Sequence, residues 1–152
     1  MNKYLIGLSC LLGITACTGQ RSSEMTVAEE VTTDFARAYF NYDYKRAQQY
    51  ITPESKKWLR FAATNVTQQT LDLLNQRNED KQTEVSLESS EVLNDSTQIV
   101  CVSVTNYVDT DSLGQQPFVR EEAVYRMKVV CRDDKWMVRM EGLPRSEKRS
   151  RD

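Results

Sequence analysis

The sequence predicts an α+β domain in which helices precede a four-stranded antiparallel sheet. From residue 26 to about residue 74, apolar side chains recur every three or four positions, which is typical of amphipathic helices. After residue 83 they recur at every second position, which is typical of strands that bury one face. The two patterns are segregated along the chain, and this segregation indicates an α+β fold with antiparallel strands.

The stretch TVAE, residues 26–29, predicts where the first helix begins. The Thr26 hydroxyl can accept a hydrogen bond from the Glu29 amide while the Glu29 carboxylate accepts one from the Thr26 amide, which is a capping box. We expect one apolar stripe of this helix to face the core. The stripe consists of Val27, Val31, Phe35, Ala38, Tyr39 and Tyr42.

Two further helices are expected before residue 83. Asp43 can cap a short helix in DYKRAQQYI, and Thr52 and Pro53 suit the start of a third helix because proline at the first position loses no hydrogen bond. We expect the third helix to be the longest. Its apolar residues are Trp58, Leu59, Ala62, Ala63, Val66, Leu73 and Leu74.

Four strands account for the alternating pattern that follows. Val85 and Leu87 mark the first strand, and the second and third each bury one face. A tight turn at Asp133 and Asp134 would place residue 131 opposite 136 and residue 129 opposite 138. The faces expected to be buried in the last three strands are Val100, Val102 and Val104; Tyr125, Met127, Val129 and Cys131; and Trp136, Val138 and Met140.

Whether Cys101 and Cys131 form a disulfide depends on how the second and third strands are paired, and two registers are considered. A hairpin centred on residue 116 would place the two cysteines opposite each other and permit a disulfide. Burial of all three valines requires a register shifted by one residue, and this register sends Cys101 to the other face. Burying three valines at about 1.5–3 kcal/mol each outweighs the roughly 2–4 kcal/mol of one disulfide. Free thiols are therefore favoured over the bridge, although a bulge could reconcile the two patterns.

The N-terminal residues have the parts of an export signal. Lys3 precedes an apolar run from Tyr4 to Ile14, which is shorter than the ~20 residues of a membrane-spanning helix. The order Ile14, Thr15, Ala16, Cys17 resembles the lipobox of bacterial lipoproteins. This resemblance implies a signal peptide at residues 1–16, acyl chains such as palmitate on Cys17, and a linker to residue 25; a soluble secreted form is the alternative. Because Thr18 rather than aspartate follows the cysteine, the resemblance also implies an outer membrane location facing the periplasm.

Composition and charge narrow the possible partners. The 152 residues carry 20 basic and 22 acidic side chains with a formal net charge of −2, and no basic stripe interleaves with aromatic residues, so we expect no nucleic-acid partner. The length suits one domain. Residues 143–152 are basic, and we expect them to form a disordered tail; contact with anionic head groups or a polymer is the alternative.

Candidate chemistry is limited because the sequence contains no histidine. General acid–base catalysis near neutral pH and imidazole metal sites therefore lack their usual side chain, and we expect no cofactor and no metal. Asp34 and Asp43, on and beside the first predicted helix, are the aspartates considered as catalytic acids, but a solvated residue and a helix cap explain them more simply. A possible ligand pocket is formed by aromatic residues, with burial in the core as the alternative reading. These residues are Tyr39, Tyr42, Tyr44 and Trp58.

The stretch FARAYFNYDYKRAQQYITPES, residues 35–55, and the hairpin DDKWMV, residues 133–138, together resemble the nuclear transport factor 2-like (cystatin-like) family, particularly its small bacterial lipoproteins of unknown function. The resemblance covers residues 26–142 and implies a cone in which helices pack on a strongly curved sheet. The fold hosts isomerases, dehydratases and binding modules, and its enzymes use an aspartate or an Asp–His pair in the cone. Without histidine, we expect a membrane-tethered, non-catalytic module that binds an envelope protein, a polymer or a small ligand. A small enzyme that uses a carboxylate in the cone is the alternative.

The first prediction concerns Cys17. We expect the intact mass of the membrane-extracted protein to fit a chain that begins at Cys17 and carries acyl groups. Each buried methylene of these groups contributes about 0.8 kcal/mol of membrane affinity, so the protein should resist carbonate washing and Cys17→Ala should be released. An unacylated mass, or a Cys17→Ala chain that stays membrane-bound, would contradict the tether.

Overall fold

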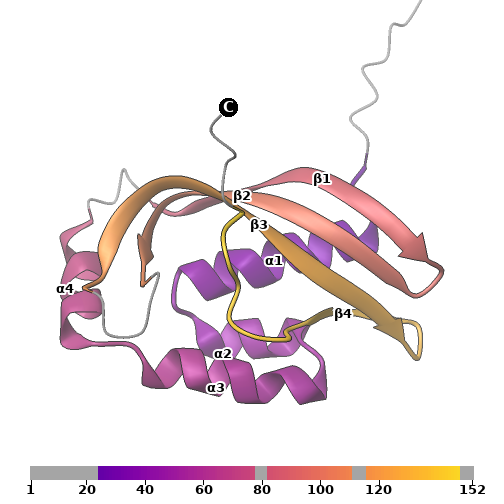
Figure 1. The fold of residues 1–152 in the computed structure, drawn as a ribbon, viewed down its shortest axis with the longest axis horizontal. Coiled ribbons are helices and arrows are strands. Elements are labelled where there is room, and N and C mark those ends of the chain that lie inside the picture. Colours follow the sequence, from indigo (N-terminus) through magenta and orange to yellow (C-terminus); the bar gives the residue numbers. More distant parts are fainter. Residues whose placement is uncertain (1–23, 78–81, 111–115, 148–152) are drawn as a thin grey trace, which may run out of the picture.

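The computed structural model describes residues 24–77, 82–110 and 116–147. The predicted signal peptide, Cys17 and residues 148–152 lie outside the described residues. Helices cover one side of an arched antiparallel sheet with the strand order β1-β2-β3-β4 (Figure 1). This arrangement confirms the predicted α+β class and agrees with the cone that the family resemblance implies.

Capping side chains begin the helices where the sequence predicts them. Thr26 and Glu29 form both bonds of the capping box, and the Asp43 carboxylate accepts a hydrogen bond from the Arg46 amide at 3.0 Å. Thr52 stands at the N-cap position of a single 3₁₀ turn that begins with Pro53, as predicted, but its side chain makes no capping hydrogen bond. The helical elements are α1 (Val27–Phe40), α2 (Tyr44–Ala47), η1 (Gln48–Tyr50), η2 (Pro53–Ser55), α3 (Lys56–Thr64) and α4 (Gln68–Gln76).

The prediction of one long third helix is wrong, because the chain breaks between α3 and α4. Asn65 ends α3, and its side-chain amide donates to the Phe61 carbonyl at 2.8 Å. Thr67 then caps α4 with Thr70 in a second capping box. Side-chain hydrogen bonds from Asn and Thr compete with a continuous helix. Among the helices that the structure describes, the longest is therefore α1, with 14 residues.

The four strands pair in the registers that bury their apolar faces. They are β1 (Glu84–Asn94), β2 (Thr97–Asp109), β3 (Phe118–Arg132) and β4 (Lys135–Arg139). Cys131 lies opposite Trp136 and Val129 opposite Val138, as predicted. Between β2 and β3, Val100 lies opposite Met127 and Val102 opposite Tyr125.

Cys101 lies opposite Arg126 rather than Cys131, so the two cysteines are not paired across the strands. Both are free, half-buried thiols in this structure. The register is not the predicted shift of one residue, but it has the face alignment that favoured free thiols, because Val100, Val102 and Val104 are fully buried and Cys101 lies on the other face.

Helix α1 packs across the concave face of the sheet, and its buried face matches the predicted stripe in part. Phe35 and Ala38 are buried as predicted, whereas Val27 is 60% exposed. The buried face also includes small residues that the prediction left out, Ala28, Thr32 and Ala36. Thr32 is buried at little cost, because its hydroxyl donates to the Ala28 carbonyl at 2.7 Å. Apolar periodicity did not indicate this part of the face because it includes threonine.

A kink in β2 changes which residues face the core. Asn106 has φ 51, in the left-handed region that asparagine tolerates better than most residues. Before it the buried residues are Val100, Val102 and Val104, whereas after it Tyr107 is fully buried. The Asn106 carbonyl accepts hydrogen bonds from the Arg77 guanidinium at 3.0 Å and the Thr83 hydroxyl at 3.1 Å. The kink therefore turns Tyr107 inward, and side chains before β1 stabilise it.

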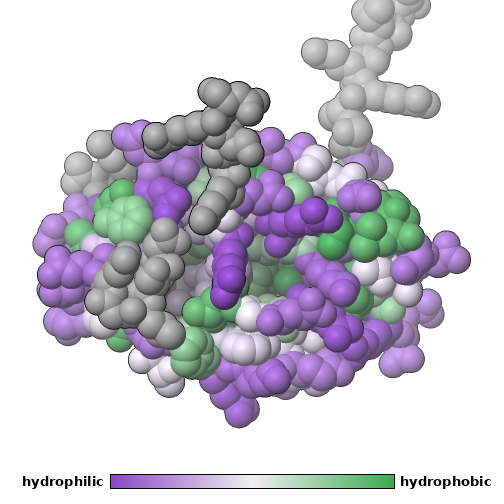
Figure 2. All heavy atoms as spheres, in the orientation of Figure 1, coloured by the Kyte–Doolittle hydropathy of each residue, from purple (hydrophilic) through white to green (hydrophobic). Residues whose placement is uncertain are grey.

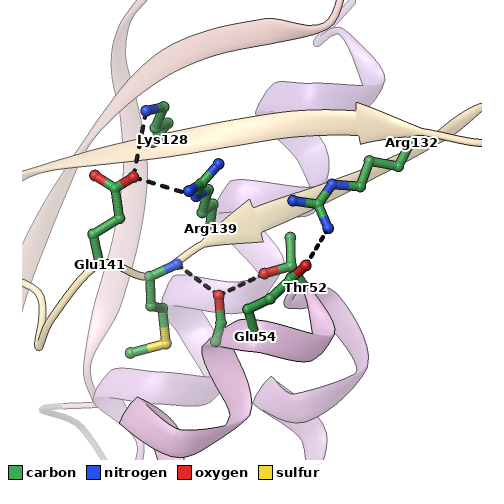
Figure 3. A network of polar contacts seen from close by, with 8 residues as sticks. Thr52, Glu54, Lys128, Arg132, Arg139 and Glu141 are labelled. Atoms are coloured by element: carbon green, nitrogen blue, oxygen red, sulfur yellow. Dashed lines mark hydrogen bonds and ion pairs between the residues drawn. The ribbon is translucent and has the colours of Figure 1, made fainter.

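A buried hydrogen-bonded joint ties the helices to β4 (Figure 3). The Met140 amide donates to the Ser55 hydroxyl oxygen at 2.8 Å. The Thr52 amide also donates to the Val138 carbonyl at 3.0 Å. The two hydroxyls of Thr52 and Ser55 lie 2.7 Å apart and share a hydrogen bond. Both residues are fully buried. On the surface beside the joint, Arg132 pairs with Glu54 at 2.6 Å.

Residues 140–147 form a strap that leaves the end of β4 and rejoins the sheet at β3. Ser146 forms an isolated bridge with Tyr125, and the Glu147 amide donates to the Val124 carbonyl at 2.8 Å. In Figure 1 the strap crosses in front of the space between the sheet and the helices. The tail predicted for residues 143–152 is therefore corrected for residues 143–147, which belong to the folded domain because they pair with the free edge of β3.

The joint predicts the effect of removing one hydroxyl. Ser55→Ala leaves the buried Met140 amide without its acceptor, so we expect the free energy of unfolding to fall by about 1–3 kcal/mol. Ser86→Ala, which truncates an exposed serine of β1, is the matched control and should change stability little. Urea denaturation of both variants measures the difference, and equal stabilities would contradict the role of the joint.

The kink makes a second stability prediction. Asn106→Gly keeps the left-handed backbone, whereas Asn106→Ala must hold a Cβ in a disfavoured conformation. We expect the alanine variant to be less stable than the glycine variant by roughly 1–2 kcal/mol. Denaturation curves of the pair test this ordering, and an alanine variant as stable as the glycine variant would show that the kink does not constrain position 106.

Candidate ligand-binding cavity

A cavity of about 1990 Å³ lies between the concave side of the sheet, the helices and the strap. Figure 2 shows a hollow in this face of the molecule, between the sheet and α3. Tyr39, Tyr42, Tyr44 and Trp58, the aromatic residues predicted for a pocket, all line this cavity. They come from α1, the turn after it, α2 and α3, so residues 39–58 supply one wall.

The turn after α1 places Tyr42 in this wall. The Asp43 amide donates to the Ala38 carbonyl at 2.9 Å and the Tyr42 amide donates to the Tyr39 carbonyl at 3.0 Å, which together make a Schellman motif. Its left-handed position is usually glycine, but here it is Tyr42 with φ 63. The Tyr42 hydroxyl donates to the Val108 carbonyl at 2.9 Å. A tyrosine at a glycine-favouring position is held by this contact with β2.

The tyrosine rings of this wall support one another. The rings of Tyr39 and Tyr44 lie 5.6 Å apart at 65°, and those of Tyr42 and Tyr44 lie 5.8 Å apart at 60°. Such edge-to-face and tilted contacts are favourable geometries for aromatic pairs. The rings are therefore fixed by their neighbours without a ligand.

The opposite wall comes from the sheet. The hydroxyls of Tyr107 and Tyr125 lie 2.8 Å apart and share a hydrogen bond. Phe40 packs against both rings, at 5.2 Å and 4.5 Å between centroids. This contact joins the last turn of α1 to β2 and β3 and closes the inner end of the cavity.

An ion pair lies beside the tyrosines. The Asp109 carboxylate is 2.7 Å from the Arg120 guanidinium, and the two side chains are only 12% and 25% exposed. The Tyr107 hydroxyl donates to the same carboxylate oxygen at 3.4 Å, and the Arg120 guanidinium lies 5.3 Å above the Phe118 ring. The Asp109 carboxylate is therefore part of the cavity wall, and the Arg120 guanidinium compensates its negative charge.

Burial raises the pKa of every tyrosine in these two walls. Burial and the nearby Asp109 carboxylate raise the pKa of Tyr42 from 10 to about 12, and burial, with a further contribution from Asp109, raises that of Tyr107 to about 12. Burial likewise raises the pKa of Tyr39, Tyr44 and Tyr125. At neutral pH these phenols stay protonated, so they can donate and accept hydrogen bonds but cannot exchange protons readily.

The two acids considered from the sequence lie elsewhere. Asp43 caps α2, and Asp34 pairs with Arg37 at 3.2 Å on the surface of α1. Both lie outside the lining of the cavity. Within the described residues, no group of three or more His, Cys, Asp or Glu side chains could hold a metal ion.

Sequence reasoning missed Tyr107, Asp109 and Arg120. Strict alternation from Val100 would turn position 106 inward and leave Tyr107 outside, yet position 106 is asparagine. A polar residue at an expected core position of a strand is a signal that the alternation changes there. The pairing of Tyr107 with Arg120 then brings the arginine to the same end of the sheet.

The raised pKa values predict the behaviour at alkaline pH. A folded-state pKa above the unfolded value means that stability is fully present below about pH 10 and is lost as the pH rises through about 12. We expect the absorbance of tyrosinate to show a component that titrates near pH 12, and urea denaturation to give lower stability at about pH 11 than at about pH 9. If all tyrosines of the folded protein titrate together near pH 10, the buried wall does not exist in solution.

Among known proteins, several solved structures are similar to this chain. No protein-family profile matches the sequence, and no curated protein matches it. A solved structure described as "Ntf2 like protein involved in plasmid conjugation" is similar at 19% sequence identity and a TM-score of 0.40. The similarity covers 80% of this chain and 48% of the other, so this chain spans about half the length of that protein.

Proposed function

We propose that this chain is a membrane-tethered, non-catalytic binding lipoprotein of the bacterial cell envelope. In this proposal acyl chains on Cys17 hold it at the outer membrane, facing the periplasm, and the cavity takes a ligand or a segment of an envelope partner. The lipobox resemblance at residues 14–17 supports the tether. No helix within the described residues is long and apolar enough to cross a bilayer.

The observation that carries the binding role is the preformed aromatic wall. Ligand sites are concave, rich in apolar and aromatic side chains, and equipped with a few polar groups that fix orientation. Here Tyr39, Tyr42 and Tyr44 supply rings with hydroxyl tips, and Asp109 and Arg120 supply a fixed polar pair. A wall whose rings are already positioned loses little freedom when a ligand binds.

The tether also limits where the cavity can act. The seven residues from Cys17 to Ser23 can span at most about 25 Å. The domain would therefore stay close to the lipid head groups, within reach of membrane proteins and of polymers that lie near the membrane.

One observation favours the alternative of a small enzyme, namely the buried carboxylate of Asp109 in the cavity wall. A general base needs an oxygen that is available to take a proton. The Arg120 guanidinium lies 2.7 Å from one oxygen of this carboxylate, and the Tyr107 hydroxyl donates to the same oxygen, so that oxygen already has partners. The sequence also contains no histidine to share proton transfer. The ion pair therefore supports the binding role over catalysis.

Complementation distinguishes the two functions. In cells that lack the gene, we expect Asp109→Asn to restore the envelope phenotype in part, because the amide keeps the shape of the wall while the charge that pairs with Arg120 is lost. Cys17→Ala and Tyr42→Gly should fail at equal protein levels. Tyr42→Gly suits this test because glycine is the residue that the Schellman motif prefers, so the turn is preserved while the ring is lost.

The melting temperature of each purified variant is the control for folding. An Asp109→Asn protein that is folded and abundant but inactive would overturn the binding role and support the enzyme. An active Cys17→Ala protein would instead contradict the tether.

A further inference from the structure

We infer that the cavity binds a neutral oligosaccharide, such as a segment of an envelope glycan. This inference rests on the proposed function, that the cavity takes a ligand, and specifies the chemical class of that ligand. It follows from the size, the charge and the polarity of the described lining.

The size favours an extended ligand. At about 1990 Å³ the cavity exceeds the roughly 300–1,000 Å³ typical of sites for drug-sized molecules. It is also open at the surface, as the hollow in Figure 2 shows. A chain of several sugar rings can enter such a space from one side and leave part of a longer polymer outside.

The charge disfavours anionic ligands. Acidic side chains outnumber basic ones in the described lining, and Arg120 is already engaged by Asp109. A phosphate or a carboxylate would meet repulsion with little compensation. The acidic side chains of the lining attract a cationic ligand only weakly, because two of them already have basic partners. Asp109 pairs with Arg120, and Glu141 lies 3.2 Å from Arg139 and 3.5 Å from Lys128.

The polarity disfavours a purely apolar ligand. A fatty acyl chain would cover the polar part of the lining, including the Asp109–Arg120 pair, without forming hydrogen bonds to it. Covering polar groups without such partners is unfavourable. An acyl chain would therefore pack well against the aromatic rings but would leave the Asp109–Arg120 pair without hydrogen-bond partners from the ligand.

A sugar ring matches both parts of the wall. Its C–H face is apolar and stacks on aromatic rings, while its rim of hydroxyls exchanges hydrogen bonds with phenols, carboxylates and guanidinium groups. Tyr44 and Trp58 supply rings on one side of the cavity, and Asp109 and Arg120 supply the polar pair on the other. Burial raises the pKa of Tyr44, so its phenol stays protonated at neutral pH and can both donate and accept such a bond.

The two tryptophans of the chain allow a matched experiment. Trp58 lines the cavity and Trp136 lies in β4, outside the lining. The full-length acylated Trp136→Phe protein therefore reports fluorescence from the cavity, and Trp58→Phe reports from elsewhere in the same fold. The probes are tetramers of N-acetylglucosamine, glucose and mannose, together with decanoate and spermidine.

We expect at least one tetramer to change the Trp58 fluorescence in a saturable way, with no change of Trp136 in the matched protein. Adding Tyr44→Ala should weaken this binding at least tenfold, and adding Tyr44→Phe should weaken it less, because the ring remains. Melting temperatures of both variants exclude unfolding as the cause.

Saturable binding of decanoate or spermidine alone would overturn the oligosaccharide inference while leaving the cavity as a binding site. If no probe changes the fluorescence of the folded protein, the oligosaccharide inference is wrong. If acrylamide also fails to quench Trp58, the cavity is closed in solution and the proposed binding role loses its support as well.

Discussion

The architecture depends on one constraint, that the helices and β4 share buried hydrogen bonds at a single joint. The Ser55 hydroxyl accepts from the Met140 amide and shares a hydrogen bond with Thr52, whose own amide binds the Val138 carbonyl. These groups are away from water, so each bond is costly to break. The helical layer is fixed to β4 at this joint. Away from the joint, the arched sheet and the helices lie farther apart, and the cavity lies between them.

The walls of the cavity resist collapse because they are built from large rings in contact. Tyr39, Tyr42 and Tyr44 brace one another, and Phe40 holds Tyr107 and Tyr125 on the sheet side. Smaller side chains would let α1 and the sheet move together and fill the space, as closely packed interiors tend to do. The same residues thus hold the space open and present the groups that a ligand would meet. The left-handed backbone at Tyr42 shows that a strained position is retained for this wall.

Local signals in the sequence were enough for much of the fold. The capping box at Thr26, the cap at Asp43 and the register of the final hairpin depend on residues close together in the chain, and the structure confirms them. Tyr39, Tyr42, Tyr44 and Trp58 could be grouped because they lie within twenty residues of one another. The Asp109–Arg120 pair could not, because it depends on a long-range register and on a kink at Asn106. The buried face of α1 was predicted only in part for a different reason, since threonines that bond their own helix, such as Thr32, can replace apolar residues.

The strap has a consequence for how this protein avoids self-association. β4 covers β3 only up to Lys128, so the rest of that strand would present free backbone groups to any neighbouring chain. Ser146 and Glu147 pair with Tyr125 and Val124 and place charged and polar residues along this edge. Unpaired strand edges are templates for edge-to-edge aggregation, and natural sheets protect them with short segments and charges. For a protein crowded on a membrane by its proposed anchor, a covered edge would keep neighbouring copies separate.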